Sequence, residues 1–323
     1  GKIYGANVNL TESTQELTDP LDTASVVGNL VHKNGWAKND GDVILVPSAD
    51  IVHDINIAAV LDRHLENREQ HGACATIVSN IVPWNTVERF GTMRLEGMPE
   101  RKAFKSNLEF EDAVGTWLTN RQAASAKIIE FREKAHRDAA LSCLNNSSFY
   151  IFDAVLFRQL LPMFTKDDKG AALIPELFQP GGPTPFSDWG RHVFKWMTQD
   201  QGQSRFPIFT DIMPLNSYWR DAGIGEELRL TNMDILRGTI DSGLEEGEGH
   251  FWNRTHYGSW RGSNVFIHHS AQIFNSIIGD NVSIGEGVRI EQSVVGSNTQ
   301  VEPRVTLKRT VISHQRDPQV STT

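Results

Sequence analysis

Aliphatic residues recur at intervals of six, five and six residues along the last fifth of the chain. Read in columns seventeen residues apart, they form three sets: Ile267–Ile284–Val301, Ile273–Ile290–Leu307 and Ile278–Val295–Ile312. Neither an α-helix nor a flat strand has this period. Short strands wound around a three-sided prism do, because each coil of about 17 or 18 residues then points an aliphatic side chain from every face toward the axis.

A second inward-facing position is predicted four residues after each aliphatic one. These positions hold Ala271, Ile277, Val282, Val288, Val294, Val305 and Val311, with Thr299 as the polar exception. Gly279, Gly285 and Gly296 directly follow an aliphatic residue, where we expect a corner that needs permissive backbone. The pattern resembles the hexapeptide-repeat, left-handed parallel β-helix family, and the alternative is an irregular β tail.

The length of the chain, 323 residues, is too great for one ordinary hydrophobic core and predicts two domains. Hydrophobic residues make up 39% and charged residues 22%, as is typical of a globular protein. Strand and helix patterns alternate before the repeat. We therefore predict a Rossmann-like α/β domain with a mixed, mostly parallel sheet over residues 1–240, a polar linker over 241–262 and the β-helix over 263–315.

Composition disfavours several classes of protein. No apolar run approaches the length of about 18 residues that a membrane-spanning helix needs. The net charge of −9 argues against nucleic acid as a main partner. Cys74 and Cys143 are too few for a disulfide framework and fit no metal-ligand spacing. Because no secretory signal is visible either, these features predict a location in the reducing cytoplasm.

Asp50 is the first candidate site residue. Val43–Pro47 has the apolar composition of a buried parallel strand, and it ends at Ser48-Ala49-Asp50. In open parallel sheets, ligands gather beyond the carboxyl ends of the strands, which is where Asp50 is predicted to lie. Taken alone, Asp50 is more typical of a helix cap or a turn. Other polar motifs follow further strands, however, and favour a site.

Three further motifs accompany Asp50. They are Glu133-Lys134 after a predicted strand over Lys127–Phe131, Asn146-x-Ser148-x-Tyr150 at the start of the next, and Tyr218-Trp219-Arg220-Asp221-Ala222-Gly223 before a predicted helix. Together with Phe90-Gly91, their order resembles the sugar-1-phosphate nucleotidyltransferases, several of which carry a C-terminal left-handed β-helix. Leu21-Asp22-Thr23-Ala24-Ser25 is similar to the Leu-Gly-Thr-Ala-Gly segment of that family.

The resemblance implies an enzyme in which an oxygen of a hexose 1-phosphate attacks the α-phosphorus of a nucleoside triphosphate and releases pyrophosphate. Such transfers depend on positioning and on neutralising charge. Mg2+ prefers one or two carboxylates together with phosphate oxygens, and the resemblance assigns Asp50 and Asp221 to that ion. It assigns Lys134 to the sugar phosphate; the alternative is a surface ion pair with Glu133 or Glu130.

The remaining implied residues bind the substrates. By the same resemblance, Glu133 accepts hydrogen bonds from sugar hydroxyls with help from Asn146. Thr23 and Ala24 would line the nucleotide and sugar side of the cleft.

The sequence also departs from the family. Only about twenty residues precede the Thr-Ala segment, so we expect the family's first strand, its Gly-rich phosphate loop and its catalytic Arg to be missing from this chain. Asp22 and Ser25 stand where the family has two glycines, and side chains there narrow the approach to a ligand. These departures keep open a second hypothesis, a non-catalytic regulatory or scaffold subunit of the same fold that acts through protein partners.

The β-helix suggests a third hypothesis and an assembly. An acyltransferase of this shape needs a catalytic His between neighbouring prisms, whereas His268 and His269 lie in the first coil, where capping its open end is the simpler role. A short prism leaves strand edges exposed at its end, and such edges favour pairing with another chain. We therefore predict a homo-oligomer.

Overall fold

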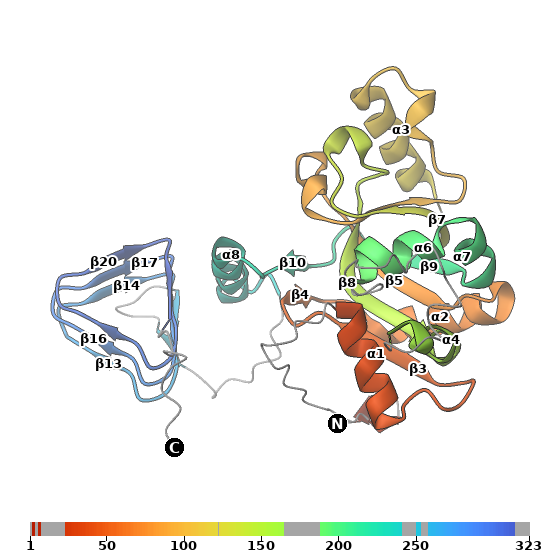
Figure 1. Cartoon of the computed structure of the whole chain (residues 1–323). Helices are drawn as coiled ribbons and strands as arrows, with labels where there is room; N and C mark the ends of the chain where they lie inside the picture. The colour runs from red at the N-terminus through yellow and green to blue at the C-terminus, as the bar shows by residue number, and fades with distance from the viewer. Residues whose placement is uncertain are drawn as a thin grey trace, which may run out of the picture. The chain divides into compact units, whose positions relative to one another are not determined.

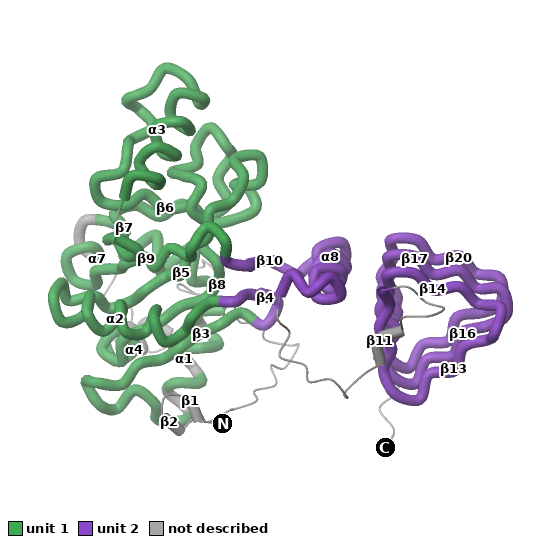
Figure 2. Tube along the Cα trace, turned by 180° about the vertical axis from the view of Figure 1, so that it is seen from behind, with its two compact units in different colours: residues 1–48, 55–216 green, residues 49–54, 217–323 purple. Residues whose placement is uncertain are grey.

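The computed structural model of the chain describes residues 2–3, 6–7, 23–121, 123–164, 188–240, 250–252 and 258–313. Internal contacts divide the chain into two compact units (Figure 2). The first comprises residues 1–48 and 55–216, and the second comprises residues 49–54 and 217–323. The second unit thus includes the end of the segment predicted as the α/β domain. Within the described ranges, no helix combines the length and the apolar character needed to cross a membrane.

The core of the first unit is a mixed sheet of six strands (Figure 1). Their order across the sheet is β3 (Val43–Pro47), β8 (Leu144–Asp153), β5 (Ala75–Ile81), β9 (Ile208–Ile212), β7 (Ser125–Arg132) and β6 (Thr92–Leu95). The neighbours β5 and β9 are parallel, and the other pairings in this sheet are antiparallel. Ile77, Ile128 and Ile151 are fully buried on these strands. The predicted α/β class with a mixed sheet is confirmed, but the sheet is mostly antiparallel and not mostly parallel as predicted.

Strand β3 differs from its prediction. The sequence predicts a buried parallel strand, but β3 pairs antiparallel with β8 and has no second neighbour among the described strands. Leu45 is consequently 39% exposed. An unbroken apolar run is typical of a strand that is covered on both faces, yet a strand at the edge of a sheet can carry the same run.

Helices and short turns surround this sheet. They are α1 (Thr23–Asn34), α2 (Ile57–His71), α3 (Asn107–Asn120), α4 (Ala154–Phe164), α6 (Lys195–Met197), α7 (Asp200–Arg205), the 3-10 turns η1 (Trp84–Arg89), η2 (Arg101–Ala103) and η3 (Arg137–Ala139), and the π-helical turn η5 (Trp189–Phe194). A separate strand pair joins β1 (Lys2–Ile3) to β2 (Ala6–Asn7). Helix α2 begins after Asn56, whose side chain accepts a hydrogen bond from the Ala59 N–H at 3.1 Å, and ends at Gly72 with a left-handed φ of 66°.

Aromatic side chains fix η5 against strand β8. The rings of Phe152 and Trp189 stack with centroids 4.3 Å apart, and the ring of Phe194 lies 5.1 Å from that of Tyr150. All four residues are buried. Because such rings bury large areas in defined geometry, they hold the backbone of η5, including Gly190, in a fixed position over β8.

The second unit contains a strand pair, a helix and the β-helix. Strand β4 (Ile51–His53) pairs antiparallel with β10 (Trp219–Asp221), and α8 (Gly225–Leu236) follows β10. Arg229 of α8 is buried and donates a hydrogen bond from Nη1 to the carbonyl oxygen of Gln292 at 3.2 Å. Helix α8 therefore contacts the β-helix directly, next to strand β21 (Val311–Ile312).

The β-helix consists of short parallel strands stacked in three sheets (Figure 1). The sheets hold β12 (Ser259–Arg261), β15 (Ile277–Ile278), β18 (Val294–Val295) and β21; β13 (Phe266–Ile267), β16 (Ser283–Ile284) and β19 (Gln300–Val301); and β14 (Gln272–Phe274), β17 (Arg289–Glu291) and β20 (Thr306–Lys308). Strand β11 (His250–Trp252) pairs antiparallel with β12. The pairing registers reproduce all three predicted columns, which confirms the parallel β-helix.

One sheet of the β-helix differs from the prediction in its second inward position. The sequence places Ile277, Val294 and Val311 inside, but each precedes an inward aliphatic residue by one position and therefore points outward. Ser276 and Ser293 are fully buried in their place. Ser276 Oγ accepts a hydrogen bond from the Ser293 N–H at 3.1 Å, so the buried hydroxyls link successive coils.

The glycines of the β-helix also have a different role from the predicted one. Neither Gly279 nor Gly285 has a positive φ, and the left-handed conformation occurs two residues later, at Asn281 (55°) and Gly287 (65°). A Cβ atom on Gly279 would lie 2.6 Å from the backbone nitrogen of Ser297 in the next coil. Glycine is needed there because the backbones of two coils approach closely, not because a corner requires unusual dihedral angles.

Candidate functional site

Asp50 and Asp221 are brought together by the strand pair of the second unit. Asp221 is the last residue of β10 and lies opposite Ile51 of β4. The Ala222 N–H donates to the carbonyl oxygen of Asp50 at 2.8 Å, which continues the antiparallel pairing by one step. Two residues that are distant in the sequence thus occupy neighbouring positions at the end of one short ribbon.

Gly223 shows how close the two carboxylates are. A Cβ atom built on Gly223 would lie 3.0 Å from Asp221 Oδ1 and 3.0 Å from Asp50 Oδ2, so at most 6.0 Å separates the two oxygens. The Gly223 N–H also donates to Asp221 Oδ1 at 3.0 Å. Because Gly223 has no side chain, the space between both carboxylates stays open.

This pair of carboxylates suits a hard divalent cation. The described residues contain no cluster of three or more His, Cys, Asp or Glu side chains with metal-ligand geometry. Two carboxylates with an open space between them are nevertheless what Mg2+ uses when phosphate oxygens and water complete its coordination. Asp50 is exposed and Asp221 is half-buried, so a ligand can reach both carboxylates.

Ion pairs hold the strand that carries Asp221. The Arg220 guanidinium donates to Glu227 Oε2 and to Asp234 Oδ2 of α8, both at 2.8 Å. The hydroxyl group of Tyr218 donates to the same oxygen of Asp234 at 3.0 Å. These contacts attach β10 to α8 through the residue that precedes Asp221. They therefore restrict the positions that the Asp221 carboxylate can adopt.

Glu133, at the end of β7 in the first unit, is enclosed by two glycines. A Cβ atom would lie 2.5 Å from Glu133 Oε2 if it were added to Gly91, and 2.2 Å if it were added to Gly190. Glu133 Oε2 is buried, and none of the described residues forms a hydrogen bond with it. Burial raises the pKa of the Glu133 carboxyl group, and the negative charge of Asp188 raises it further.

Asn146 lies beside the same glycine. Its backbone N–H donates to the carbonyl oxygen of Gly91 at 2.7 Å, and its side-chain Nδ2 donates to the hydroxyl oxygen of Tyr150 at 3.0 Å. Asn146 Oδ1 accepts from the Ser148 N–H at 3.1 Å. Burial raises the pKa of Tyr150 and keeps its hydroxyl group protonated. Glu133, Asn146 and Tyr150 therefore form one polar group around Gly91.

Lys134 has an exposed side chain and an unusual backbone. Its φ is 45°, and its N–H donates to the carbonyl oxygen of Phe90 at 3.1 Å. The ammonium group forms no ion pair with any described residue, and Glu130, one of the partners proposed from the sequence, pairs with Arg94 and Arg132 instead. The cation remains available for an anionic ligand.

Thr23 and Ala24 open helix α1. Thr23 is exposed and Ala24 is fully buried. Helix α1 packs against α4 and against η5, the turn that carries Gly190. Leu21, Asp22 and the side chain of Ser25 lie outside the described residues. The assignment of Thr23 and Ala24 to the cleft stays a prediction.

Sequence reasoning missed Gly190, Asp188 and Tyr150 as neighbours of Glu133. Asp188 and Gly190 belong to Phe186-Ser187-Asp188-Trp189-Gly190, which is similar to the Asp-Phe-Gly segment of the adenylyl and guanylyl members of the family. That similarity was the available signal. No local pattern, however, indicates which carboxylate a given glycine will contact after folding.

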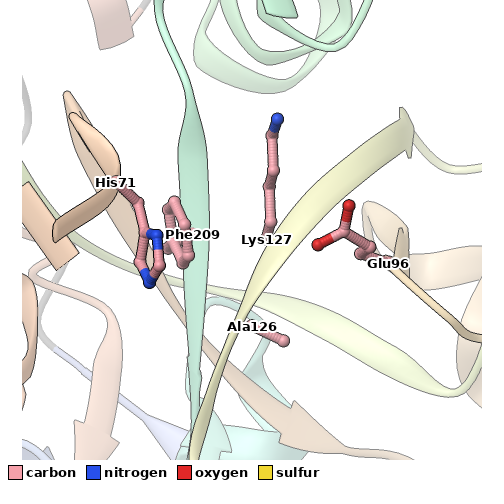
Figure 3. A pocket seen from close by; sticks show the side chains of 5 residues that line it. All are labelled: His71, Glu96, Ala126, Lys127 and Phe209. Atoms are coloured by element: carbon pink, nitrogen blue, oxygen red, sulfur yellow. The ribbon is translucent and has the colours of Figure 1, made fainter.

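Two cavities of the first unit are lined by other residues. One, of about 400 Å3, lies beside His71, whose ring stacks on that of Phe209 at 5.5 Å, with Lys127 and Glu96 on the opposite side (Figure 3). The other, of about 540 Å3, lies between α3 and the ends of β5 and β9. None of the residues that line these two cavities belongs to the predicted site.

This chain is similar to known glucose-1-phosphate adenylyltransferases over part of its length. A glucose-1-phosphate adenylyltransferase of Bacillus thuringiensis (strain Al Hakam) is 24% identical over 213 residues, which cover 66% of this chain and 42% of that protein. One from Desulforamulus reducens is 27% identical over 193 residues, or 60% and 35% of the two chains. The matched part is thus less than half of either relative. The family model described as nucleotidyl transferase matches residues 2–238.

That match covers most of the sequence. The chain therefore belongs to the nucleotidyl transferase family, and its resemblance to the sugar-1-phosphate nucleotidyltransferases is confirmed.

Proposed function

We propose that this protein joins a hexose 1-phosphate to a nucleoside triphosphate, giving a nucleoside diphosphate sugar and pyrophosphate, in a Mg2+-dependent reaction. Family membership supports sugar-phosphate nucleotidyl transfer in general. The observation that carries the finer proposal is the approach of one oxygen of Asp50 and one of Asp221 to the same point beside Gly223, at 3.0 Å each.

In this proposal Asp50 and Asp221 hold the metal ion. Bound Mg2+ would neutralise negative charge on the substrate phosphates. The contacts of Arg220 with α8 keep the strand of Asp221 in place, and Gly223 leaves room for the ion and for phosphate oxygens. The protein's share of catalysis is then to position two anionic substrates.

Sugar recognition would fall to the polar group around Gly91. Glu133 Oε2 is a buried acceptor that lacks a hydrogen-bond partner among the described residues, so a sugar hydroxyl group that donates to it would remove the cost of leaving it unsatisfied. Asn146 and Tyr150 supply further hydrogen-bonding groups beside it. The exposed ammonium of Lys134 would pair with the sugar phosphate.

A pyrophosphate-release assay tests the proposal. Purified protein with Mg2+ would be supplied with each of the four nucleoside triphosphates and with glucose 1-phosphate or mannose 1-phosphate. The names of the relatives make ATP and glucose 1-phosphate the first pair to test. Pyrophosphate release that requires both substrates is the expected result.

Variants locate the site. Asp50→Ala and Asp221→Ala should each lower turnover by about 100-fold or more, because a bound metal ion contributes several kcal/mol to charge stabilisation. Their melting temperatures should stay near that of the wild type. Asp112→Ala, which removes an exposed carboxylate from α3, is the matched control and should keep full activity. Unchanged rates in either site variant would refute the metal assignment.

The same assay addresses the second hypothesis. If the wild type released no pyrophosphate with any pair of substrates, a non-catalytic subunit that acts through protein partners would replace the transferase. Loss of activity restricted to the Asp50 and Asp221 variants would exclude that subunit role as the sole function. A cytoplasmic location and a homo-oligomer stay predictions of the sequence.

A further inference from the structure

The cavity of about 540 Å3 in the first unit has the size of a small-molecule site. It shares no lining residue with the candidate transferase site, so it requires its own explanation. Helix α3 covers one side, and the ends of β5 and β9 with the chain that follows them form the other.

The cavity wall is largely apolar. Ile81, Trp84, Leu118, Met213 and Leu215 are among the residues that line it. Leu215 is 86% exposed at the rim. Side chains of this kind in a concave surface favour the apolar body of a ligand, because binding removes their surface from water.

One charged residue, Arg121, belongs to this lining. The guanidinium has a single hydrogen bond to the described residues, from Nη1 to the carbonyl oxygen of Ala124, at the long distance of 3.5 Å. Desolvation lowers the pKa of Arg121, which indicates that its charge is poorly solvated. The nearest carboxylate in electrostatic terms, Asp211, is already engaged through both oxygens by Arg63.

The cavity therefore combines an apolar wall with a positive charge whose nearest carboxylate among the described residues is held by Arg63. We infer that it binds a small amphipathic anion, whose acidic group pairs with the Arg121 guanidinium and whose ring system packs against Trp84, Leu118 and Met213. A carboxylate, sulfonate or phosphate would fulfil the acidic role equally, since all accept charge-assisted hydrogen bonds from guanidinium. The cavity of Figure 3 has no such preference, because Lys127 and Glu96 both line it.

Two fluorescent probes test this inference on the full chain. 8-Anilinonaphthalene-1-sulfonate carries the ring system and an anionic group, and N-phenyl-1-naphthylamine carries the same rings without the sulfonate. The wild type should bind the sulfonate more tightly than the neutral probe. Arg121→Gln should weaken the sulfonate by about tenfold, the loss of one charge-assisted contact, and leave the neutral probe unchanged.

A second variant fills the cavity. Gly115 lies on α3 and lines the cavity, and a Cβ atom added there meets no atom within 4 Å. The Cβ atom of Gly115→Phe therefore has room, and its ring should fill the cavity and abolish binding of both probes. Thr116→Phe puts the same ring on the next, exposed position of α3 and should leave binding unchanged. Melting curves would verify that both variants are folded.

Each outcome of these binding measurements either supports or overturns the proposed anion site. A selective loss of the sulfonate in Arg121→Gln, with loss of both probes in Gly115→Phe, supports the site. Equal weakening of both probes in Arg121→Gln would overturn the role of the charge. Binding that survives in a folded Gly115→Phe variant would overturn the site itself, because the probes would then occupy another surface. If Gly115→Phe fails to fold, the ratio of the two affinities in Arg121→Gln decides alone.

Discussion

Each unit buries a side-chain oxygen that has no hydrogen-bond partner among the described residues, but the surroundings of the two oxygens differ. Glu133 Oε2 in the first unit is flanked by Gly91 and Gly190, by the amide of Asn146 and by charged Asp188. Thr299 Oγ1 in the second unit lies in the β-helix, at an inward position between aliphatic columns.

This difference distinguishes Glu133, which we interpret as a ligand-binding group, from Thr299, which we interpret as a packing defect, that is, a buried polar atom without a function. Around Glu133, Gly91 and Gly190 pack against the carboxylate because neither has a Cβ atom, and the polar groups of Asn146 and Tyr150 lie next to Gly91. Thr299 stands one coil after the buried Val282, at a repeat position that holds aliphatic residues or alanine in other coils. An unsatisfied polar atom therefore indicates a site only where further polar groups accompany it.

Of these two residues, Glu133 should show the larger effect. Glu133→Gln keeps the size of the side chain and removes its charge, so kcat/KM for the hexose 1-phosphate should fall by about 10- to 100-fold, the usual loss for a hydrogen bond to a charged group. The dependence of the rate on Mg2+ should not change. Steady-state assays with each substrate varied in turn measure both. A Glu133→Gln enzyme with wild-type kinetics would make Glu133 a packing defect like Thr299.

The same residue should produce a characteristic pH dependence of stability. The pKa of Glu133 is raised above its ordinary value of 4.5, first by burial and then by the negative charge of Asp188. Between the ordinary and the raised pKa, the folded protein binds a proton that the unfolded chain releases. The free energy of unfolding should therefore fall as pH rises through that window.

Glu133→Gln is the control for this effect. It has no carboxyl group to titrate, so its stability should decrease less over the same pH range, and at neutral pH it should melt at a higher temperature than the wild type. Melting curves from pH 4 to pH 8, with both proteins side by side, measure the difference. Identical slopes for the two proteins would mean that burial of Glu133 is not costly.

The two units also differed in how far their sequences predicted them. The β-helix columns were predictable because stacked coils repeat one local rule, in which Ile284 must pair with Ile267 below it and Val301 above it. The wrong inward prediction for Ile277 and Val294 comes from counting four residues in every step of the repeat, whatever the length of the step. In a six-residue step, the fourth residue lies two positions before the next aliphatic residue and therefore faces inward as that residue does. In a five-residue step, the fourth residue lies only one position before it and therefore faces outward.

The site was only partly predictable for a different reason. Asp50 and Glu133 follow strands and Asp221 ends one, and their order, compared with a known family, indicated each of them. Gly190 could not be placed beside Glu133 in this way, because a turn and an aromatic cluster between distant segments create that contact. Motifs predict which residues carry chemistry, whereas tertiary packing decides which small residues leave room for it.

The smallest effect is expected at Thr299. Thr299→Val replaces the buried hydroxyl group, which has no partner among the described residues, by a methyl group of nearly the same size. The free energy of unfolding should rise by about 1 kcal/mol, because a buried polar group is no longer left unsatisfied. Thr310→Val is the matched control, since Thr310 Oγ1 donates to the carbonyl oxygen of Lys308 at 3.0 Å.

The control should lose about 0.5–1.5 kcal/mol, the usual contribution of one hydrogen bond. Guanidinium unfolding of the wild type and both variants measures the changes, and neither substitution should alter transferase kinetics. If Thr299→Val destabilised the protein as much as Thr310→Val does, the Thr299 hydroxyl group would have a partner in solution. A buried water molecule would be the simplest candidate, and the oxygen of Thr299 would no longer be a packing defect.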